Sequence, residues 1–321
     1  MSTTIKNDDD LSMVSILIPV YNAGEYLRRC LDSITGQTYS NLQIVIIDDG
    51  STDNSWIIMQ EYSAADDRIE IYRQENKGVS TTRNLLLEKI KGDFLLFIDS
   101  DDWIEPQTVE MLIQKQQTEN PDVVVYQIYG SKVDHEGSFT RDEIIKLFVE
   151  HRVFHGSLCN KLIRRSLVNG LHFDETVSYG EDALMVWQVL QCVNRVVVIN
   201  EHLYHLGQNK NSLTRQRFDG RKCSAFTVWR TISSDCENYW PQYSELAHAR
   251  FACEMTKVLR DAVLDKYKSN DQITRLQQVV RKDGHLIRKT GVSSSKMRSF
   301  AWLVSHHYKL TSFLSRYISF Y

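Results

Sequence analysis

Three aspartates lie within four positions, in the run Asp99-Ser-Asp-Asp102. Carboxylates this close repel one another unless a cation or hydrogen-bond donors neutralise them. Oxygen ligands of this kind suit Mg²⁺ or Mn²⁺, which keep part of their water shell and take further ligands from substrate phosphates. The structural alternative is a cap, because an Asp before the turn Trp103-Ile-Glu-Pro106 can satisfy the first amides of a helix. The spacing alone leaves a metal site and a cap open.

A second acidic run is Asp48-Asp-Gly-Ser-Thr-Asp53. Asp48 and Asp49 point in different directions because they are adjacent. One can support the loop while the other accepts hydrogen bonds from a ligand such as a nucleobase imide. The alternative is a turn, since Asp and Ser are common turn residues and Asp53 can cap the following helix.

Two predicted helices begin close to charged residues. Asn76-Lys-Gly78 opens the helix that carries Arg83, whose guanidinium can anchor a loop carboxylate or reach a nucleotide. Gly180-Glu-Asp182 opens an amphipathic segment in which the helix dipole stabilises ionised acids. An ionised Asp182 at the rim of a cleft can act as a general base, and the alternative is an ordinary helix start.

Two histidines, His202 and His205, follow a strongly β-branched run at 195–199. His205 is a candidate metal ligand, and the alternative is a histidine satisfied by neighbouring protein groups. Arg215 and Arg217 can pair with phosphates or with acidic residues of the chain itself.

The order of elements brings the acidic runs to one edge of a sheet. Short apolar runs alternate with helical patterns from residue 14 to 125, as expected for parallel strands with helices on both faces. In such α/β sheets, ligands bind beyond the carboxyl ends of the strands, where Pro19-Val-Tyr-Asn22 and both acidic runs fall. Expected strands are 14–20, 42–47, 69–72, 94–98, 123–128 and 195–199, and expected helices are 25–35, 53–64, 79–90, 107–117, 141–149 and 182–190.

The pattern is helical from about residue 219 onward, with long segments near 223–236, 243–266 and 272–288. We therefore expect three parts. Residues 1–12 form a disordered or extended N-terminus, 13–217 an α/β domain with a Rossmann-like, mostly parallel sheet, and 218–321 a C-terminal helical region.

Composition narrows the class of function. With 38 Lys and Arg against 41 Asp and Glu, the net charge of −3 gives no overall reason to bind nucleic acid. The sequence has neither a dinucleotide-binding glycine motif nor a P-loop. The six cysteines lack metal-binding spacing, so we interpret them as reduced thiols of a cytoplasmic protein. We expect neither a signal peptide nor a membrane-spanning helix, because no apolar run is suitable.

The C-terminal tail differs from the rest of the chain. Residues 281–321 hold eight basic residues and one acidic residue, and 300–321 hold seven aromatic residues. A basic, aromatic amphipathic helix is typical of a segment that lies on an anionic membrane surface. The alternative is packing on the rest of the chain or on a second subunit. Peripheral contact with the inner face of the cell membrane and a homodimer both stay open.

Five segments, in chain order, resemble the inverting family-2 glycosyltransferases of the GT-A fold, of the kind that build bacterial polysaccharides. They are Val14 to Asn22, Ile44 to Asp53, Asn76 to Asn84, Phe94 to Asp102 and Gly180 to Asp182. The resemblance covers residues 13–215, and the ordered set at strand ends makes it specific. The chain departs from the family pattern at Leu206-Gly207, where many bacterial members have an aromatic residue and Arg.

The resemblance implies a role for each polar strand end. Asp49 meets the nucleobase, Asp101 holds a divalent metal, Mn²⁺ or Mg²⁺, that bridges the diphosphate, and Asp182 matches the catalytic base with Glu181 as its supporting neighbour. Asp102 and His205 are further candidates for the metal. The other donor-binding residues are Pro19, Tyr21, Asn22, Arg83, Asp99 and Ser100.

The chemistry implied is one inverting displacement at the anomeric carbon. The donor would be a nucleotide sugar, such as a UDP-linked hexose or N-acetylhexosamine, and the acceptor a hydroxyl of a glycan or lipid-linked molecule in cell-surface polysaccharide synthesis. Two alternatives are a non-catalytic protein that binds nucleotide sugars and a nucleotidyltransferase. Asp101 and Asp182 argue against the first, and the absence of a Gly- and Arg-rich triphosphate loop near Pro19 argues against the second.

Overall fold

The computed structural model describes residues 12–131, 136–150, 156–209, 217–268, 270–293, 295–308 and 311. The chain divides into two compact units, each assembled from separate segments. Unit 1 comprises Met1–Ile144, Ser157–Glu175 and Gln188–Lys210, and unit 2 comprises Ile145–Gly156, Thr176–Trp187 and Asn211–Tyr321. The expected extended N-terminus lies, apart from Ser12, outside the described residues.

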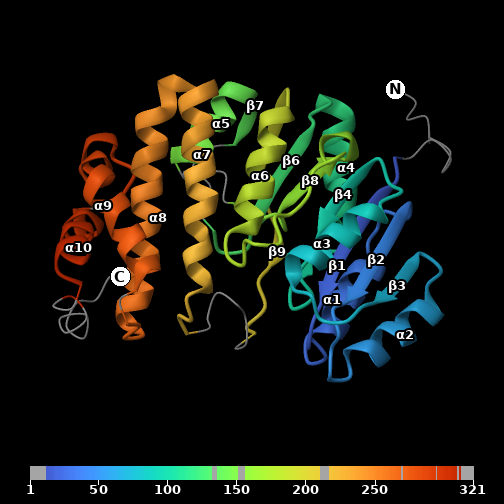
Figure 1. The fold of residues 1–321 in the computed structure, drawn as a ribbon. Helices are drawn as coiled ribbons and strands as arrows, with labels where there is room; N and C mark the ends of the chain where they lie inside the picture. Colours follow the sequence, from blue (N-terminus) through green and yellow to red (C-terminus); the bar gives the residue numbers. More distant parts are fainter. Residues whose placement is uncertain are drawn as a thin grey trace. The chain divides into compact units, whose positions relative to one another are not determined.

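In the described part of unit 1, nine strands form one mixed sheet (Figure 1). Their order is β3-β2-β1-β4-β8-β6-β9-β5, with β7 on β9. β1 to β4 are parallel, as are β6 and β9, whereas β8, β5 and β7 are antiparallel to their neighbours. The strands are β1 (Val14–Val20), β2 (Leu42–Asp48), β3 (Ile69–Arg73), β4 (Phe94–Phe97), β5 (Trp103–Ile104), β6 (Val123–Ile128), β7 (Gly137–Thr140), β8 (Lys161–Arg164) and β9 (Arg195–His205).

Helices follow the strands in the order that the sequence predicts. The first group is α1 (Leu27–Thr35), α2 (Ser55–Ala65), α3 (Val79–Glu88), α4 (Thr108–Glu119), α5 (Arg141–Glu150) and α6 (Glu181–Cys192). The second group is α7 (Ala225–Tyr239), α8 (Ser244–Leu264), α9 (Asp271–Thr290) and α10 (Ser295–His306), and short 3-10 turns are η2 (Arg165–Leu167), η4 (Arg221–Ser224) and η5 (Pro241–Tyr243).

The sheet is apolar on both faces. Ile16 and Ile18 of β1 and Ile44 of β2 share a buried core with residues of α1, α2 and α4. Intervening residues such as Leu17 point to the opposite face, because side chains alternate along a strand, and α3 packs on β1 and β2. Burial on both faces explains why these strands are continuously apolar.

Unit 2 is built around long helices, with α8 in contact with both α7 and α9, and α10 in contact with α8 and α9 (Figure 1). Its aromatic residues join distant segments. Trp187 Nε1 donates to Asp235 Oδ2 at 2.8 Å, and the Phe148 ring lies 5.6 Å from Trp187 and 6.1 Å from Trp229 between centroids. These contacts explain why the last residues of α5 and the first residues of α6 belong to the same unit as the C-terminal helices. The sequence analysis predicts a single boundary near residue 217, whereas unit 2 also includes the earlier segments Ile145–Gly156 and Thr176–Trp187.

The beginning of the basic tail packs on unit 2. Gln277 Nε2 of α9 donates to the carbonyls of Val304 and Ser305 at 3.0 and 3.1 Å, and Arg281 Nε donates to Ser305 at 2.8 Å. Residues 312–321 of the predicted membrane helix lie outside the described residues. Among the helices that the structure describes, none is both long and apolar enough to cross a bilayer.

Candidate functional site

The loops after β1 and β2 are joined by hydrogen bonds. The Asn22 amide donates to Ser51 Oγ at 2.9 Å, and the Thr52 amide donates to Asn22 Oδ1 at 2.8 Å. Asn22 has a φ of 48°, a left-handed conformation that Asn adopts more readily than most residues. Tyr21 is 53% exposed beside this fixed loop. Pro19 is the last residue but one of β1 and lies beyond the pairing with β4.

Asp49 follows β2 directly and holds the loop that leads into α3. Its Oδ1 accepts hydrogen bonds from the Lys77 amide at 2.9 Å and from Gln74 Nε2 at 2.8 Å, while Oδ2 accepts from the Gly78 amide at 2.9 Å. An ionised carboxylate offers about four acceptor positions, so the protein uses most of them. One acceptor position, on Oδ2, is therefore left for the predicted contact of Asp49 with a nucleobase.

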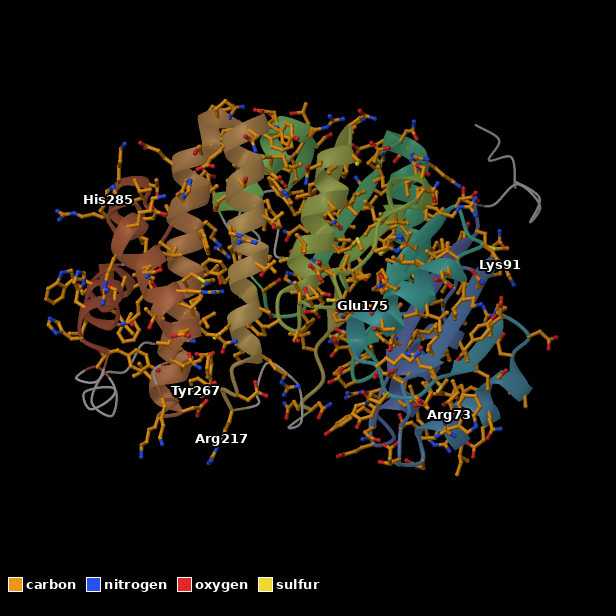
Figure 2. All side chains as sticks on the ribbon, in the orientation of Figure 1. Arg73, Lys91, Glu175, Arg217, Tyr267 and His285 are labelled. Atoms are coloured by element: carbon orange, nitrogen blue, oxygen red, sulfur yellow. The ribbon has the colours of Figure 1, made fainter. Side chains whose placement is uncertain are left out.

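Asp48, in contrast, is fully buried and supports its own turn. Its Oδ1 accepts the Ser51 amide at 3.0 Å, and Arg73 Nε approaches Oδ2 at 3.0 Å from the end of β3 (Figure 2). Both adjacent acids thus have structural partners. The two interpretations left open by the sequence, loop support and ligand binding, are not exclusive for Asp49.

The loop that carries Asp99 to Asp102, called the D-x-D loop below, is anchored to β9 through one tyrosine. Tyr204 donates its hydroxyl hydrogen to Asp102 Oδ2 at 2.6 Å, and the Asp99 amide donates to the same Tyr204 oxygen at 3.2 Å. The Gly207 amide donates to Asp102 Oδ1 at 2.6 Å. Both oxygens of Asp102 therefore bind protein donors, which favours an anchoring role over the predicted role as a further metal ligand.

Asp101 lies between these anchors, and its backbone is held from two sides. Arg29 Nη2 donates to the Asp101 carbonyl at 3.2 Å. A Cβ placed on Gly207 would lie 2.0 Å from that carbonyl oxygen, so only glycine fits this approach. Gly207, at which the chain departs from the family pattern, is therefore required for the D-x-D loop to take this position.

Burial changes the acidity of the anchoring carboxyl. Desolvation of the Asp102 side chain, together with the nearby Asp99 carboxylate, raises the pKa of Asp102 to about 7. The Tyr204 and Gly207 hydrogen bonds oppose this effect. Burial also raises the pKa of Tyr204 well above its usual range, which keeps its hydroxyl protonated as a donor.

Arg83 reaches the D-x-D loop from the other side. Its Nη2 lies 3.3 Å from Asp99 Oδ1, and its guanidinium carbon lies 5.6 Å from the centroid of the Phe173 ring. The Arg83 side chain is 6% exposed, whereas that of Asp99 is 41% exposed. Arg83 thus neutralises part of the acidic run from within the protein, and Asp99 remains accessible to a ligand.

His205 is part of a stack of four side chains. Arg29 lies 3.6 Å above the Trp103 ring, Trp103 stacks on His205 at 4.8 Å, and His205 stacks on Tyr129 at 4.8 Å. The Nε2 atom of His205 lies 2.7 Å from Glu105 Oε1. These contacts account for His205 within the fold, and its role as a metal ligand stays a prediction.

The oxygen ligands that the D-x-D loop offers fit a cation that arrives together with a substrate. Within the part of the chain that the structure describes, no three His, Cys, Asp or Glu side chains are close enough to form a complete metal site. Mg²⁺ and Mn²⁺ commonly bind one or two carboxylates and take the remaining ligands from water and phosphates. The partly exposed Asp99 and Asp101, with Ser100 between them, match this requirement.

Asp182 lies in the first turn of α6, in unit 2, whereas the other candidate residues except Glu181 belong to unit 1. Gly180 precedes the helix with a φ of +88°, and its carbonyl accepts the Leu184 amide at 3.1 Å. A Cβ on Gly156 would lie 2.5 Å from Ala183 Cβ, so close packing fixes this turn. The helix dipole stabilises the acids at its start.

Sequence reasoning missed the residues that hold the D-x-D loop: Arg29, Tyr204 and Gly207. Arg29 belongs to a helix whose amphipathic pattern places it on the polar side, and its cation–π contact with Trp103 leaves no sequence signal. Tyr204 lies beyond the predicted strand 195–199, where nothing in the sequence distinguishes it as an anchor. The predicted strand ends at Ile199 because polar residues follow it, whereas β9 continues to His205 with Leu203 and Tyr204 buried.

Comparison with known proteins gives one consistent family. Residues 15–172 match the family described as Glycosyl transferase family 2. Glycosyltransferase GlyG of Streptococcus pneumoniae serotype 4 is 30% identical over 226 residues, which are 64% of this chain and 74% of GlyG. Glycosyltransferase GlyA of the same organism is 36% identical over 220 residues, 63% of this chain, which spans only 31% of GlyA.

A solved structure has the same fold. S. aureus TarS 1-349 in complex with UDP-GlcNAc superimposes with a TM-score of 0.67 at 18% identity, covering 93% of this chain and 92% of that one. The similarity confirms the predicted fold class, a mostly parallel sheet flanked by helices and followed by a C-terminal helical region.

Proposed function

Because the chain belongs to the family-2 glycosyltransferases, we propose that it transfers a sugar from a UDP-sugar to a hydroxyl of a glycan or lipid-linked acceptor, with inversion. The sugar would be a hexose or N-acetylhexosamine, and the product a cell-surface polysaccharide. TarS, which shares the fold, has been solved in complex with UDP-GlcNAc. That complex supports the choice of a UDP-sugar as donor. The observation that carries the proposal is the anchored D-x-D loop beside the loops after β1 and β2.

The donor would lie across the carboxyl edge of the sheet. Tyr21, Asn22 and Asp49 are the proposed contacts of the nucleoside, and Asp99, with Arg83 behind it, is the proposed contact of the ribose. The hydrogen bonds between the β1 and β2 loops support this arrangement, because a fixed loop loses little conformational entropy on binding.

Asp101 would hold the divalent cation, Mn²⁺ or Mg²⁺, with Ser100 and Asp99 next to it. A cation bound there supplies positive charge against the negative charge that builds up on the departing diphosphate. Asp101 is the better candidate than Asp102, because both Asp102 oxygens already accept hydrogen bonds from the protein.

Asp182 would take the proton of the acceptor hydroxyl while the oxygen attacks the anomeric carbon opposite the leaving diphosphate. One displacement inverts the configuration, so an α-linked donor gives a β-glycoside. Glu181, in the same helical turn, would support the ionised base or orient the acceptor.

Calorimetry with UDP and Mn²⁺ tests the donor site. We expect Asp101→Asn to weaken UDP binding at least about tenfold, because the metal contact is lost. Asp93→Asn is the matched control, since Asp93 precedes β4 and lies at the opposite end of the same strand. Unchanged UDP binding in Asp101→Asn would remove the metal assignment. A panel of nucleotide sugars in thermal-shift assays with Mn²⁺ would then identify the donor.

We also propose a cytoplasmic location with peripheral membrane contact through the C-terminal tail. The basic composition of residues 281–321 supports it, while the packing of α10 on α9 shows that part of the tail binds unit 2. Co-sedimentation of the full chain with anionic and with neutral vesicles tests this contact. Equal sedimentation with both kinds of vesicle would count against membrane contact. The alternative is that the tail packs on a second subunit in a homodimer.

A further inference from the structure

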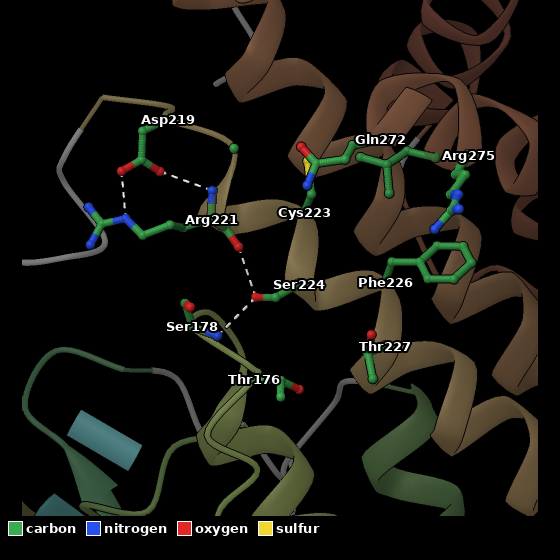
Figure 3. A pocket seen from close by; sticks show the side chains of 12 residues that line it. Thr176, Ser178, Asp219, Arg221, Cys223, Ser224, Phe226, Thr227, Gln272 and Arg275 are labelled. Carbon is green, nitrogen blue, oxygen red and sulfur yellow. Dashed lines mark hydrogen bonds and ion pairs between the residues drawn. The ribbon is translucent and has the colours of Figure 1, made fainter. Parts of the chain in front are cut away.

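Unit 2 contains a polar cavity that the proposed donor site does not use (Figure 3). Its volume is about 510 Å³, within the range of small-molecule sites. Its walls come from Thr176 and Ser178 before α6, from η4 and the start of α7, and from Gln272, Arg275 and Leu276 of α9. We call it the Arg275 cavity. All of its walls belong to unit 2.

The walls of the Arg275 cavity carry groups suited to a polyol. Thr176, Ser178, Thr227 and Gln272 line it with hydroxyl and amide groups, whereas the Ser224 hydroxyl is used by hydrogen bonds within the protein. Hydroxyl and amide groups both donate and accept, so they can match sugar hydroxyls of either orientation. The thiol of Cys223 is no nucleophile here, because burial raises its pKa to about 11.

The cavity also presents a positive charge that has no partner among the described residues. Arg221 is paired with Asp219, whose Oδ2 lies 2.5 Å from Arg221 Nε. The Arg275 side chain is exposed and forms no hydrogen bond or ion pair with any residue that the structure describes. An exposed guanidinium at the wall of a polar cavity is suited to a phosphate or carboxylate on the ligand.

A second hollow of about 410 Å³ shares Phe226 and Arg275 with the first. We call it the Lys282 cavity. Arg230 and Lys282 line it, and neither forms an ion pair with a described residue. Its two acids, Glu237 and Asp283, both contact His248 instead. The two cavities thus place three cations, Arg230, Arg275 and Lys282, along α7 and α9, and none of them forms an ion pair with a described residue, although Glu237 and Asp283 line the second cavity with them.

The Arg275 cavity is linked to the proposed base through the chain before α6. Ser224 Oγ accepts the Ser178 amide at 3.1 Å and the Tyr179 amide at 2.9 Å, and it contacts the Arg221 carbonyl at 2.8 Å (Figure 3). Asp182 follows Ser178 by four residues, a span of at most about 14 Å. The wall of this cavity therefore leads directly into the helix that carries Asp182.

We infer that the Arg275 cavity, continued by the Lys282 cavity, binds the acceptor, and that this acceptor is a hydroxyl-rich molecule that carries anionic groups. The inference rests on the proposed function. The anion can be a phosphate or a carboxylate, since a guanidinium binds both.

Ligand-observed NMR on the full chain tests this with matched probes. The first pair is glycerol 3-phosphate and glycerol, and the second is glucuronate and glucose, so each pair differs in its anionic group. We expect each anionic probe to bind at least about tenfold more tightly than its neutral partner. The stronger of the two anionic probes identifies the group that the acceptor carries.

Substitution locates the binding. We expect Arg275→Gln to weaken the anionic probes at least about fivefold, whereas Arg288→Gln, an exposed arginine further along α9, leaves them unchanged. Equal binding of neutral and anionic probes, absence of binding by all four, or equal loss in both variants would overturn the inference. UDP binding with Mn²⁺, measured in parallel, distinguishes this failure from that of the proposed function, because only the latter requires the loss of UDP binding.

Discussion

Tyr204 donates its hydroxyl hydrogen to Oδ2 of Asp102 across 2.6 Å, from a strand 102 residues further along the chain. The hydroxyl oxygen of Tyr204 in turn accepts a hydrogen bond from the Asp99 amide at 3.2 Å. One hydroxyl group therefore joins both ends of the D-x-D loop, and the position of Asp101 between them depends on it. The shape of the proposed metal site is set by β9 as much as by β4.

Removing this hydroxyl tests the anchor. Tyr204→Phe leaves a buried Asp102 oxygen without its donor, which costs about 1–3 kcal/mol of unfolding free energy. We expect UDP binding with Mn²⁺ to weaken at least about fivefold as well, because the loop that carries Asp101 loosens. Urea unfolding and calorimetry measure the two effects.

Tyr39→Phe is the control for Tyr204→Phe. Tyr39 is also a buried tyrosine of unit 1, and its hydroxyl donates to the Ser12 carbonyl at 2.6 Å, away from the D-x-D loop. This variant should lose stability and keep its UDP affinity. If both variants bind UDP equally well, Tyr204 supports the fold alone.

Gly207 is a steric requirement of the same loop. Gly207→Ala places a Cβ 2.0 Å from the Asp101 carbonyl oxygen, so the loop or the strand end must shift, at a cost of about 1–3 kcal/mol. UDP binding should weaken at least about tenfold. Gly284→Ala in α9, whose nearest contact would be an ordinary 3.6 Å, should instead stabilise by about 0.5–1 kcal/mol. Wild-type UDP affinity in Gly207→Ala would contradict the prediction.

His248 makes the stability of unit 2 depend on pH. Hydrogen bonds with Asp283 and Glu237 raise the pKa of His248, so protonation favours the folded state. This contribution is complete below the unfolded pKa of about 6.5 and is lost as the pH rises through the raised pKa. At pH 6, His248→Gln should lower the unfolding free energy by about 1–2 kcal/mol, and at pH 9 the difference should become small.

Urea unfolding followed by tryptophan fluorescence checks the His248 prediction. His285→Gln is the control, since His285 is an exposed histidine on α9 (Figure 2). A difference between the wild type and His248→Gln that stays constant from pH 6 to pH 9 would disprove the role of protonation.

The strands that carry the site were predictable from sequence because they are buried on both faces. The predicted bounds 14–20 match β1, and those of β2 and β4 differ by one residue. β5, β7 and β8 were not predicted, because they have only two to four residues and pair antiparallel. β8 begins with Lys161, a charged residue that is nevertheless buried, since its Nζ donates to Asn160 Oδ1 at 2.7 Å.

The sequence was enough to identify the candidate site residues as a set, but not to predict which contacts each of them makes in the fold. Asp102 and Asp101 have the same chemistry in the sequence, and only the distant Tyr204 and Gly207 distinguish the anchor from the candidate metal ligand. For Asp49, the sequence left loop support and ligand binding open, and its contacts with the loop before α3 could not be read from a strand end. Side-chain partners far apart in the chain leave no local pattern.

The central claim is that Asp182 deprotonates the acceptor in transfer from a nucleotide sugar. The direct measurement is the rate of sugar transfer by Asp182→Asn, with UDP binding recorded on the same folded sample and Asp93→Asn as the control variant. We predict a rate about 10²–10⁴-fold below that of the wild type with UDP affinity nearly unchanged. A folded Asp182→Asn that transfers sugar at close to the wild-type rate would contradict the account.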